Sequence, residues 1–130
     1  MTVKLAELKT RKQVLAGHLK DPAFRERWEK TALARAVALR LVAYRAEHAL
    51  SQTALARILQ MKQPAVARLE AGEKIPSWDT LARISDALGV EFLIDIAPKG
   101  RRALVGKRAS RAEVVEEFTT EHNEVLVAVE

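Results

Sequence analysis

The chain has 130 residues, of which 48% are hydrophobic and 30% are charged. This composition is typical of one globular domain with additional elements and excludes a disordered protein. The absence of cysteine excludes disulfides and thiolate metal sites, and no apolar run is long enough to cross a membrane. The net charge of +5 allows binding to nucleic acid without requiring it. Because the N-terminus lacks the apolar core of a signal peptide, we expect a soluble, cytoplasmic protein.

Charge and helix signals divide the chain into three parts. Residues 1–30 carry eight Lys and Arg against four Asp and Glu, and we expect an N-terminal helical extension there. Residues 31–97 are nearly neutral, with eight basic against seven acidic residues, and should form the main domain. In residues 98–130 the basic residues all precede the acidic ones, which suggests a basic linker followed by a short helix and strand tail.

Two helices are expected in the N-terminal region. Residues 3–19 place leucines near helical spacing, which predicts an amphipathic helix that packs on its own domain or on a partner rather than on a membrane. Asp21 and Pro22 mark the start of the next helix, as an N-cap followed by proline in the first turn. No breaker follows until about His48, so one long helix is predicted over 22–48. Its first half exposes Phe24 and Trp28, which fold back on the first helix or meet another protein.

The stretch from Ser51 to Gly72 predicts two short helices joined by a tight turn. Ser51 is a suitable N-cap, and Gly72 is a suitable left-handed C-cap. The turn falls on residues 60–62, between apolar positions that point inward from both helices. Those positions are Leu55, Ala56, Leu59, Val66 and Leu69, and Met61 points inward from the turn.

This spacing resembles the helix-turn-helix of the phage-repressor and Cro class, and the ending Arg68-Leu69-Glu70-x-Gly72 strengthens the resemblance. One departure is Gln60, which stands where this class usually has glycine and would need a strained positive φ. The resemblance implies a recognition helix that enters the major groove, with DNA-binding residues Gln52, Lys62, Gln63, Pro64, Ala67, Arg68 and Lys74. Gln63 would read adenine, and Arg68 would read guanine or hold a phosphate. An ordinary helix pair that binds no nucleic acid is the alternative.

After this motif the chain predicts one more helix and then a strand. Ser77 is the expected N-cap and Gly89 the expected end of the helix. Residues 90–97 alternate, with Val90, Phe92, Ile94 and Ile96 on one face, which is a strand pattern. A lone strand leaves its backbone unpaired. We expect this strand to pair with its two-fold copy in a dimer, and a ladder with residues 125–129 of the same chain is the rival.

The last third of the chain gives weaker signals. Residues 98–109 read as a basic, glycine-containing linker. The sequence from Ser110 to Glu113 has the pattern of a capping box and predicts a short helix that ends at Asn123. Residues 125–129 predict a final strand. The expected fold is therefore mainly α, a repressor-like helical bundle with an N-terminal helical extension and one or two short C-terminal strands.

Catalytic chemistry finds no support in the sequence. His18, His48 and His122 are scattered and lack the spacing of metal ligands. No glycine-rich phosphate loop occurs, and the serines are better explained as helix caps. We expect no enzyme activity, no catalytic residues, no metal and no cofactor.

The sequence also resembles HigA-type antitoxins over residues 19–97. The resemblance includes the Leu19-x-Asp21-Pro22-x-Phe24-Arg25 segment, Lys62-Gln63-Pro64 at the start of the recognition helix, and the strand in place of a last helix. It implies a homodimer on a palindromic operator that also neutralises a toxin, with Phe24 and Trp28 in the toxin contact. A stand-alone repressor without a toxin partner is the alternative.

Overall fold

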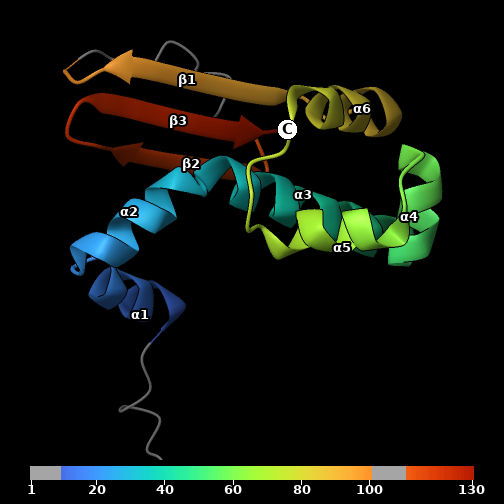
Figure 1. Cartoon of the computed structure of the whole chain (residues 1–130), viewed down its shortest axis with the longest axis horizontal. Coiled ribbons are helices and arrows are strands. Elements are labelled where there is room, and N and C mark those ends of the chain that lie inside the picture. The colour runs from blue at the N-terminus through green and yellow to red at the C-terminus, as the bar shows by residue number, and fades with distance from the viewer. Residues whose placement is uncertain (1–9, 101–110) are drawn as a thin grey trace, which may run out of the picture. The chain divides into compact units, whose positions relative to one another are not determined.

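A computed structural model describes residues 10–100 and 111–130, which form two compact units that separate between Lys30 and Thr31 (Figure 1). Within these residues the first unit holds two helices, and the second holds four helices and a three-stranded antiparallel sheet. This architecture confirms the mainly α fold class with a small C-terminal sheet. The predictions for residues 3–9, for most of the linker and for Ser110 lie outside the described residues.

The first unit contains α1 (Arg11–His18) and α2 (Pro22–Lys30). Helix α1 begins after Thr10, whose hydroxyl accepts the backbone N–H of Gln13 at 3.2 Å, while the Gln13 amide oxygen accepts the N–H of Thr10 at 2.9 Å. This reciprocal pair is a capping box. Helix α2 begins as predicted, because the Asp21 carboxylate accepts a backbone N–H two residues on at 3.0 Å.

The prediction of one helix over residues 22–48 is wrong. The chain leaves helical geometry at Thr31, which has φ −103° and ψ 10°, and α3 (Ala32–His48) begins after it. Threonine is β-branched and its hydroxyl competes for local hydrogen bonds, so it favours helix ends over helix interiors. Here the Thr31 hydroxyl accepts from Nη1 of Arg35 at 3.3 Å, and its carbonyl accepts the N–H of Arg35 at 2.9 Å.

The two helices of the central motif form where the sequence predicts them. They are α4 (Gln52–Leu59) and α5 (Gln63–Ala71). The Ser51 hydroxyl caps α4 by accepting a backbone N–H at 3.0 Å. Gly72 ends α5 with φ 67°, and Gln60 takes the strained positive φ of 53° that its position requires.

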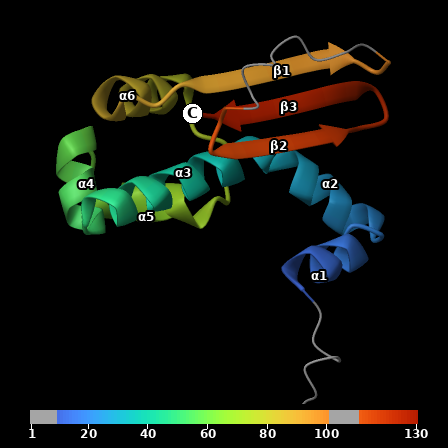
Figure 2. The same cartoon turned by 180° about the vertical axis from the view of Figure 1, so that it is seen from behind.

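Helix α3 lies between the sheet and α5, and both views agree on this order (Figures 1 and 2). Helix α6 (Trp78–Leu88) is capped by Ser77 and ends at Gly89, as predicted.

The helices and the sheet of the second unit share one hydrophobic core. Each fully buried aliphatic side chain contributes about 1.5–3 kcal/mol to stability, so this core stabilises the second unit. Its buried members are Ala36, Val37, Leu41, Leu55, Ala56, Leu59, Val66, Leu81, Ile84, Val90, Val127 and Val129, with Met61 and Leu69 packed against them.

The sheet has the order β1-β3-β2, made of β1 (Phe92–Pro98), β2 (Val114–Thr119) and β3 (Asn123–Val129). The two predicted strands are confirmed at β1 and β3, while the helix predicted after Ser110 is wrong, because β2 occupies that segment. The run VVEEFT is rich in β-branched and aromatic residues. It pairs with β3 along its length, so tertiary pairing prevails over the local capping pattern.

Strand β1 pairs with β3 of the same chain, from Phe92 opposite Val129 to Pro98 opposite Asn123. The intrachain ladder, which was the rival of the symmetric one, is therefore present. Of the four residues predicted for the dimer, Val90 is buried and Phe92 packs partly against the core. The other two, Ile94 and Ile96, are 43% and 65% exposed.

Replacement of Gln60 or Ala49 by glycine should stabilise the protein. Both residues have a positive φ, 53° and 52° respectively, which costs an L-residue roughly 1–2 kcal/mol. After the larger entropy loss of glycine is subtracted, each variant should gain about 0.5–1 kcal/mol in the free energy of unfolding. Urea denaturation measures this gain. The control Ala87→Gly, inside α6, should instead lose about 1 kcal/mol. A loss in all three variants would contradict the strain argument.

Candidate nucleic-acid interface

The residues predicted to face DNA lie on one stretch of α4, α5 and the loop after them. Lys62, Gln63, Pro64, Arg68 and Lys74 are exposed, and Gln52 and Ala67 are half-buried. Pro64 occupies the first turn of α5, where its missing N–H leaves no helical hydrogen bond unmade. The helix-turn-helix therefore places Gln52, Lys62 and Gln63 near the N-terminal end of α5, while Arg68 lies farther along the helix and Lys74 lies after it.

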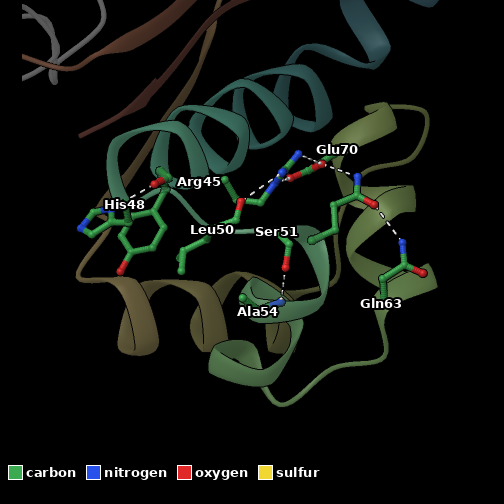
Figure 3. Close-up of polar contacts among 9 residues, drawn as sticks. Arg45, His48, Leu50, Ser51, Ala54, Gln63 and Glu70 are labelled. Atoms are coloured by element: carbon green, nitrogen blue, oxygen red, sulfur yellow. Dashed lines mark hydrogen bonds and ion pairs between the residues drawn. The ribbon is translucent and has the colours of Figure 1, made fainter.

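A chain of hydrogen bonds orients Gln63 (Figure 3). Nε2 of Gln63 donates to Oε1 of Gln52 at 2.8 Å, and Nε2 of Gln52 donates to a carboxylate oxygen of Glu70 at 2.6 Å. Glu70 in turn accepts from the guanidinium of Arg45, through Nη2 at 2.9 Å and through Nε. The side chain of Gln63 is thus positioned from inside the protein before any ligand arrives.

The hydrogen-bond capacity left on Gln63 suits a base edge. An amide carries two N–H donors and one carbonyl acceptor, and Gln52 uses only one of the donors. The remaining N–H and the carbonyl form the donor and acceptor pair that matches N7 and N6 of adenine in the major groove. Gln52 is committed to Gln63 and Glu70 by its side chain, so any contact to a phosphate falls to the backbone N–H groups at the start of α4.

The ion pair between Arg45 and Glu70 joins α3 to α5. The Glu70 side chain is only 6% exposed, and the guanidinium of Arg45 binds it through two nitrogens and also reaches the carbonyl of Leu50 at 3.3 Å. Burial raises the pKa of Glu70, but the hydrogen bonds from Arg45 and Gln52 outweigh this, so its pKa lies below the ordinary value. The same hydrogen bond to Glu70 raises the pKa of Arg45.

The turn between the two helices has its own support. Gln60 has no glycine-like freedom, but its carbonyl accepts a hydrogen bond from Nη1 of Arg83 on α6 at 3.3 Å. Its N–H bonds to the carbonyl of Arg57 at 3.2 Å. Hydrogen bonds to α4 and to α6 therefore stabilise the strained turn, and the spacing between α4 and α5 is kept although position 60 is not glycine.

Sequence reasoning missed Arg45 and Glu70 as positioning residues. Glu70 was named only as part of the family-like ending, and Arg45 was not singled out within the helix predicted over residues 22–48. The two lie 25 residues apart, and nothing in the local pattern indicates that they meet. Their pairing depends on the angle at which α3 crosses α5, which tertiary packing sets.

The two aromatic residues predicted to contact a toxin lie together in the first unit. The rings of Phe24 and Trp28 stack with centroids 6.1 Å apart, and the ring of His18 lies 5.0 Å from Phe24. Both aromatic side chains are half-buried, and Trp28 lines a groove of about 500 Å³ with residues of α1. The aromatic pair therefore does contact the first helix, which was one of the two expectations.

Residues 41–94 match the helix-turn-helix family model. The resemblance to the phage-repressor and Cro class is confirmed for this segment. The helix-turn-helix family is a DNA-binding, regulatory one, so the match supports a DNA-binding transcriptional regulator. No curated protein and no solved structure matches the chain.

Two kinds of site find no counterpart in residues 10–100 and 111–130. No cluster of three or more histidines and carboxylates there could hold a metal ion. None of the helices in the same residues has the length and hydrophobicity needed to span a bilayer.

Removal of the Glu70 charge should weaken the domain and change its response to acid. Glu70→Gln should lower the free energy of unfolding by about 1–3 kcal/mol at neutral pH, because the charged hydrogen bonds to Arg45 are lost. The wild-type contribution is complete above the ordinary glutamate pKa of about 4.3 and falls as the pH drops below it toward the lower folded-state value. The variant should lack that acid-dependent part. Urea unfolding across the acid range measures both effects.

The exposed carboxylate of Glu73 provides the control. Glu73→Gln changes the net charge equally and should leave the stability and its pH dependence as in wild type. Equal losses in the two variants would mean that net charge, and not the ion pair, is responsible.

Proposed function

We propose that this chain is a sequence-specific transcriptional regulator that binds a palindromic operator in double-stranded DNA as a homodimer. The observation that best supports this function is the orientation of Gln63 by Gln52, Glu70 and Arg45. A recognition helix presents its N-terminal residues to base edges, and Gln63 is the first residue of α5. An internal hydrogen-bond chain that ends at this exposed position is hard to explain by stability alone.

The other exposed residues divide into base-reading and phosphate-binding roles. Arg68, on the exposed face of α5, can form two parallel hydrogen bonds to O6 and N7 of guanine. Lys62 and Lys74 lie before and after α5 and are point charges suited to phosphates on either side of the groove. Pro64 and Ala67 offer apolar contact to a thymine methyl group.

We expect a homodimer because one recognition helix contacts only a short stretch of DNA. A single recognition helix reads only a half-site, and proteins of this kind present two helices about 34 Å apart, one turn of DNA. The two half-sites of the operator are then related by the same two-fold symmetry as the two protomers, which makes the operator a palindrome.

We further propose that the regulator is the antitoxin of a toxin–antitoxin pair, with the first unit in contact with the toxin. Helices α1 and α2 contain no fully buried residue, although they carry Phe24 and Trp28. The groove beside Trp28 combines apolar Val14 and Leu15 with the cations of Arg11 and Lys12. This surface suits a partner segment with an apolar anchor and nearby carboxylates.

DNA binding can be tested with two substitutions that distinguish base recognition from electrostatic attraction to phosphates. Arg68→Ala should cost about 1–3 kcal/mol of binding free energy and relax the preference at one base pair. Lys74→Ala should weaken all sequences alike and lower the salt dependence, because it removes a phosphate contact. Mobility-shift titrations against a panel of operator variants at several salt concentrations measure both. Unchanged affinity and preference in Arg68→Ala would mean that the assigned face of α5 is wrong.

The antitoxin role can be tested by co-purification with the product of the neighbouring open reading frame. The double variant Phe24→Ala/Trp28→Ala should lose most of the toxin, because buried aromatics are the usual anchors of such interfaces. Leu39→Ala, which truncates an apolar side chain that is 49% exposed on α3, is the control and should retain it. Full retention of the toxin by the double variant would mean that other residues make the contact. No binding by the wild type would contradict the antitoxin function and leave DNA binding unaffected.

A further inference from the structure

One edge of β1 has backbone groups that no other strand uses among the residues that the structure describes. On the inner side, Glu91 and Glu130 exchange both backbone hydrogen bonds, at 3.1 and 2.9 Å, and the N–H of Lys99 donates to His122 at 2.9 Å. Antiparallel pairing alternates with a period of two. The odd-numbered residues from 91 to 99 therefore turn their N–H and C=O groups toward β3. Those of Phe92, Ile94 and Ile96 point to the outer edge.

The side chains along this edge are apolar and exposed. Ile94 and Ile96 are 43% and 65% exposed, and they belong to the sheet face that continues into the core. Beside them, α6 and β1 enclose a groove of about 800 Å³ with Trp78, 81% exposed, at its rim. The other edge strand, β2, is different, since Glu116 and Glu117 lie in its middle. Charges of that kind protect a sheet edge from pairing, and β1 has no such protection in its middle on the core face.

We propose that this edge of β1 pairs antiparallel with β1 of a second copy of the chain, about a two-fold axis at Ile94. The pairing supplies the dimer that the proposed operator recognition needs, and it depends on that function only for its biological role. It uses the edge opposite to β3, so the intrachain ladder and the symmetric ladder coexist in one continuous sheet.

The outward backbone groups allow three registers with good overlap. Ile94 can lie opposite the partner's Ile94, opposite the partner's Phe92, or opposite the partner's Ile96. In the first register every outward N–H and C=O of the three residues is paired, because Phe92 then faces the partner's Ile96 and the reverse holds on the other side of the axis. With Ile94 opposite the partner's Phe92, Ile96 faces the partner's Val90, which lies before the strand. With Ile94 opposite the partner's Ile96, Phe92 faces the partner's Pro98, which has no N–H, so the carbonyl of Phe92 stays unpaired.

The charges on the opposite face of β1 select the same register. With Ile94 at the axis, Asp95 lies opposite the partner's Leu93, and Glu91 lies opposite the partner's Ala97. A shift in one direction places Glu91 opposite the partner's Asp95, and a shift in the other places Asp95 opposite the partner's Asp95. Like charges directly opposite each other destabilise a sheet. Only the symmetric register about Ile94 avoids them.

The resulting dimer presents both recognition helices on one side. A two-fold axis perpendicular to a continuous sheet leaves the core faces of both halves on the same side of it. In each copy α3 packs on β2 and β3 from that side, and α5 packs on α3 beyond it (Figure 2). Both α5 helices therefore lie on the same side of the joined sheet, as binding to one DNA duplex requires. The partner's Ile96 comes beside Phe92, which lines the groove under Trp78.

Single cysteine variants test the register without DNA. The chain has no cysteine, so one introduced cysteine can form a disulfide only between copies. Residues that face each other in a hydrogen-bonded pair have Cα atoms about 5.5 Å apart, which a disulfide can span. Ile94→Cys should therefore give a covalent dimer under mild oxidation. Ile96→Cys should not, because the two copies of this residue lie roughly 13 Å apart in this register. Equal linkage of both variants, or linkage of Ile96→Cys alone, would overturn the proposal.

Sedimentation of lysine variants tests the interface itself. The wild type and Val115→Lys should be dimers at micromolar concentration, and Ile94→Lys should be a monomer with an unchanged circular dichroism spectrum. Val115 is a matched control, 46% exposed on β2. A monomeric wild type, or a dimer that only Val115→Lys disrupts, would rule the interface out. If Ile94→Lys is a monomer but still binds a DNA half-site, the dimer interface and the DNA-binding surface are distinct. The mobility-shift series tests the proposed DNA function by itself.

Discussion

The ion pair between Arg45 and Glu70 is the contact on which the arrangement of the DNA-facing surface depends. It joins α3 to α5 through a carboxylate that is almost fully enclosed, and a buried charge is stable only while its partner stays in place. Gln52 bonds to the same carboxylate and so ties α4 to the pair. The Glu70 carboxylate therefore links α3, α4 and α5, and the orientation of Gln63 depends on the same carboxylate. A change that weakens this pair alters stability and recognition together.

The sheet is part of the same structural unit and not an appendage. Val127 and Val129 of the last strand belong to the core that also contains Leu55, Leu59 and Val66 of the helix-turn-helix. The family match ends at residue 94, yet the side chains that complete the core come from more than 30 residues later. The recognition surface thus rests on a core that the matched segment cannot complete by itself.

Local signals in the sequence were sufficient for the parts of the fold that local chemistry decides. Ser51, Gly72, Ser77 and Gly89 each occupy the cap position predicted for them, because a cap depends on one side chain or one φ angle. The strand β2 was mistaken for a helix because its identity depends on pairing with β3, which the capping pattern after Ser110 does not reveal. The exposed positions of the candidate site could be placed by resemblance. The charges that orient them could not, since they meet only in the folded chain.

Helix α3 connects the sheet to the DNA-facing surface through three arginines spaced five residues apart. Five residues advance the direction of a side chain by roughly 140° around a helix, so Arg35, Arg40 and Arg45 point to different neighbours. Arg35 binds both oxygens of Glu116 on β2, at 2.8 and 3.2 Å, and Arg45 binds Glu70 on α5.

Arg40 is held less firmly than the other two arginines. Its side chain is 11% exposed, and its nearest carboxylates are those of Glu113 at 3.4 Å and Glu47 at 3.9 Å. Its Nε and Nη1 atoms have no hydrogen-bond partner among the described residues. A buried cation held only by longer-range attraction is the weakest of the three connections. Arg35 and Arg45, on either side of it along α3, each bind a carboxylate through two nitrogens, so among these arginine contacts the sheet and α5 are joined to α3 chiefly by these two ion pairs.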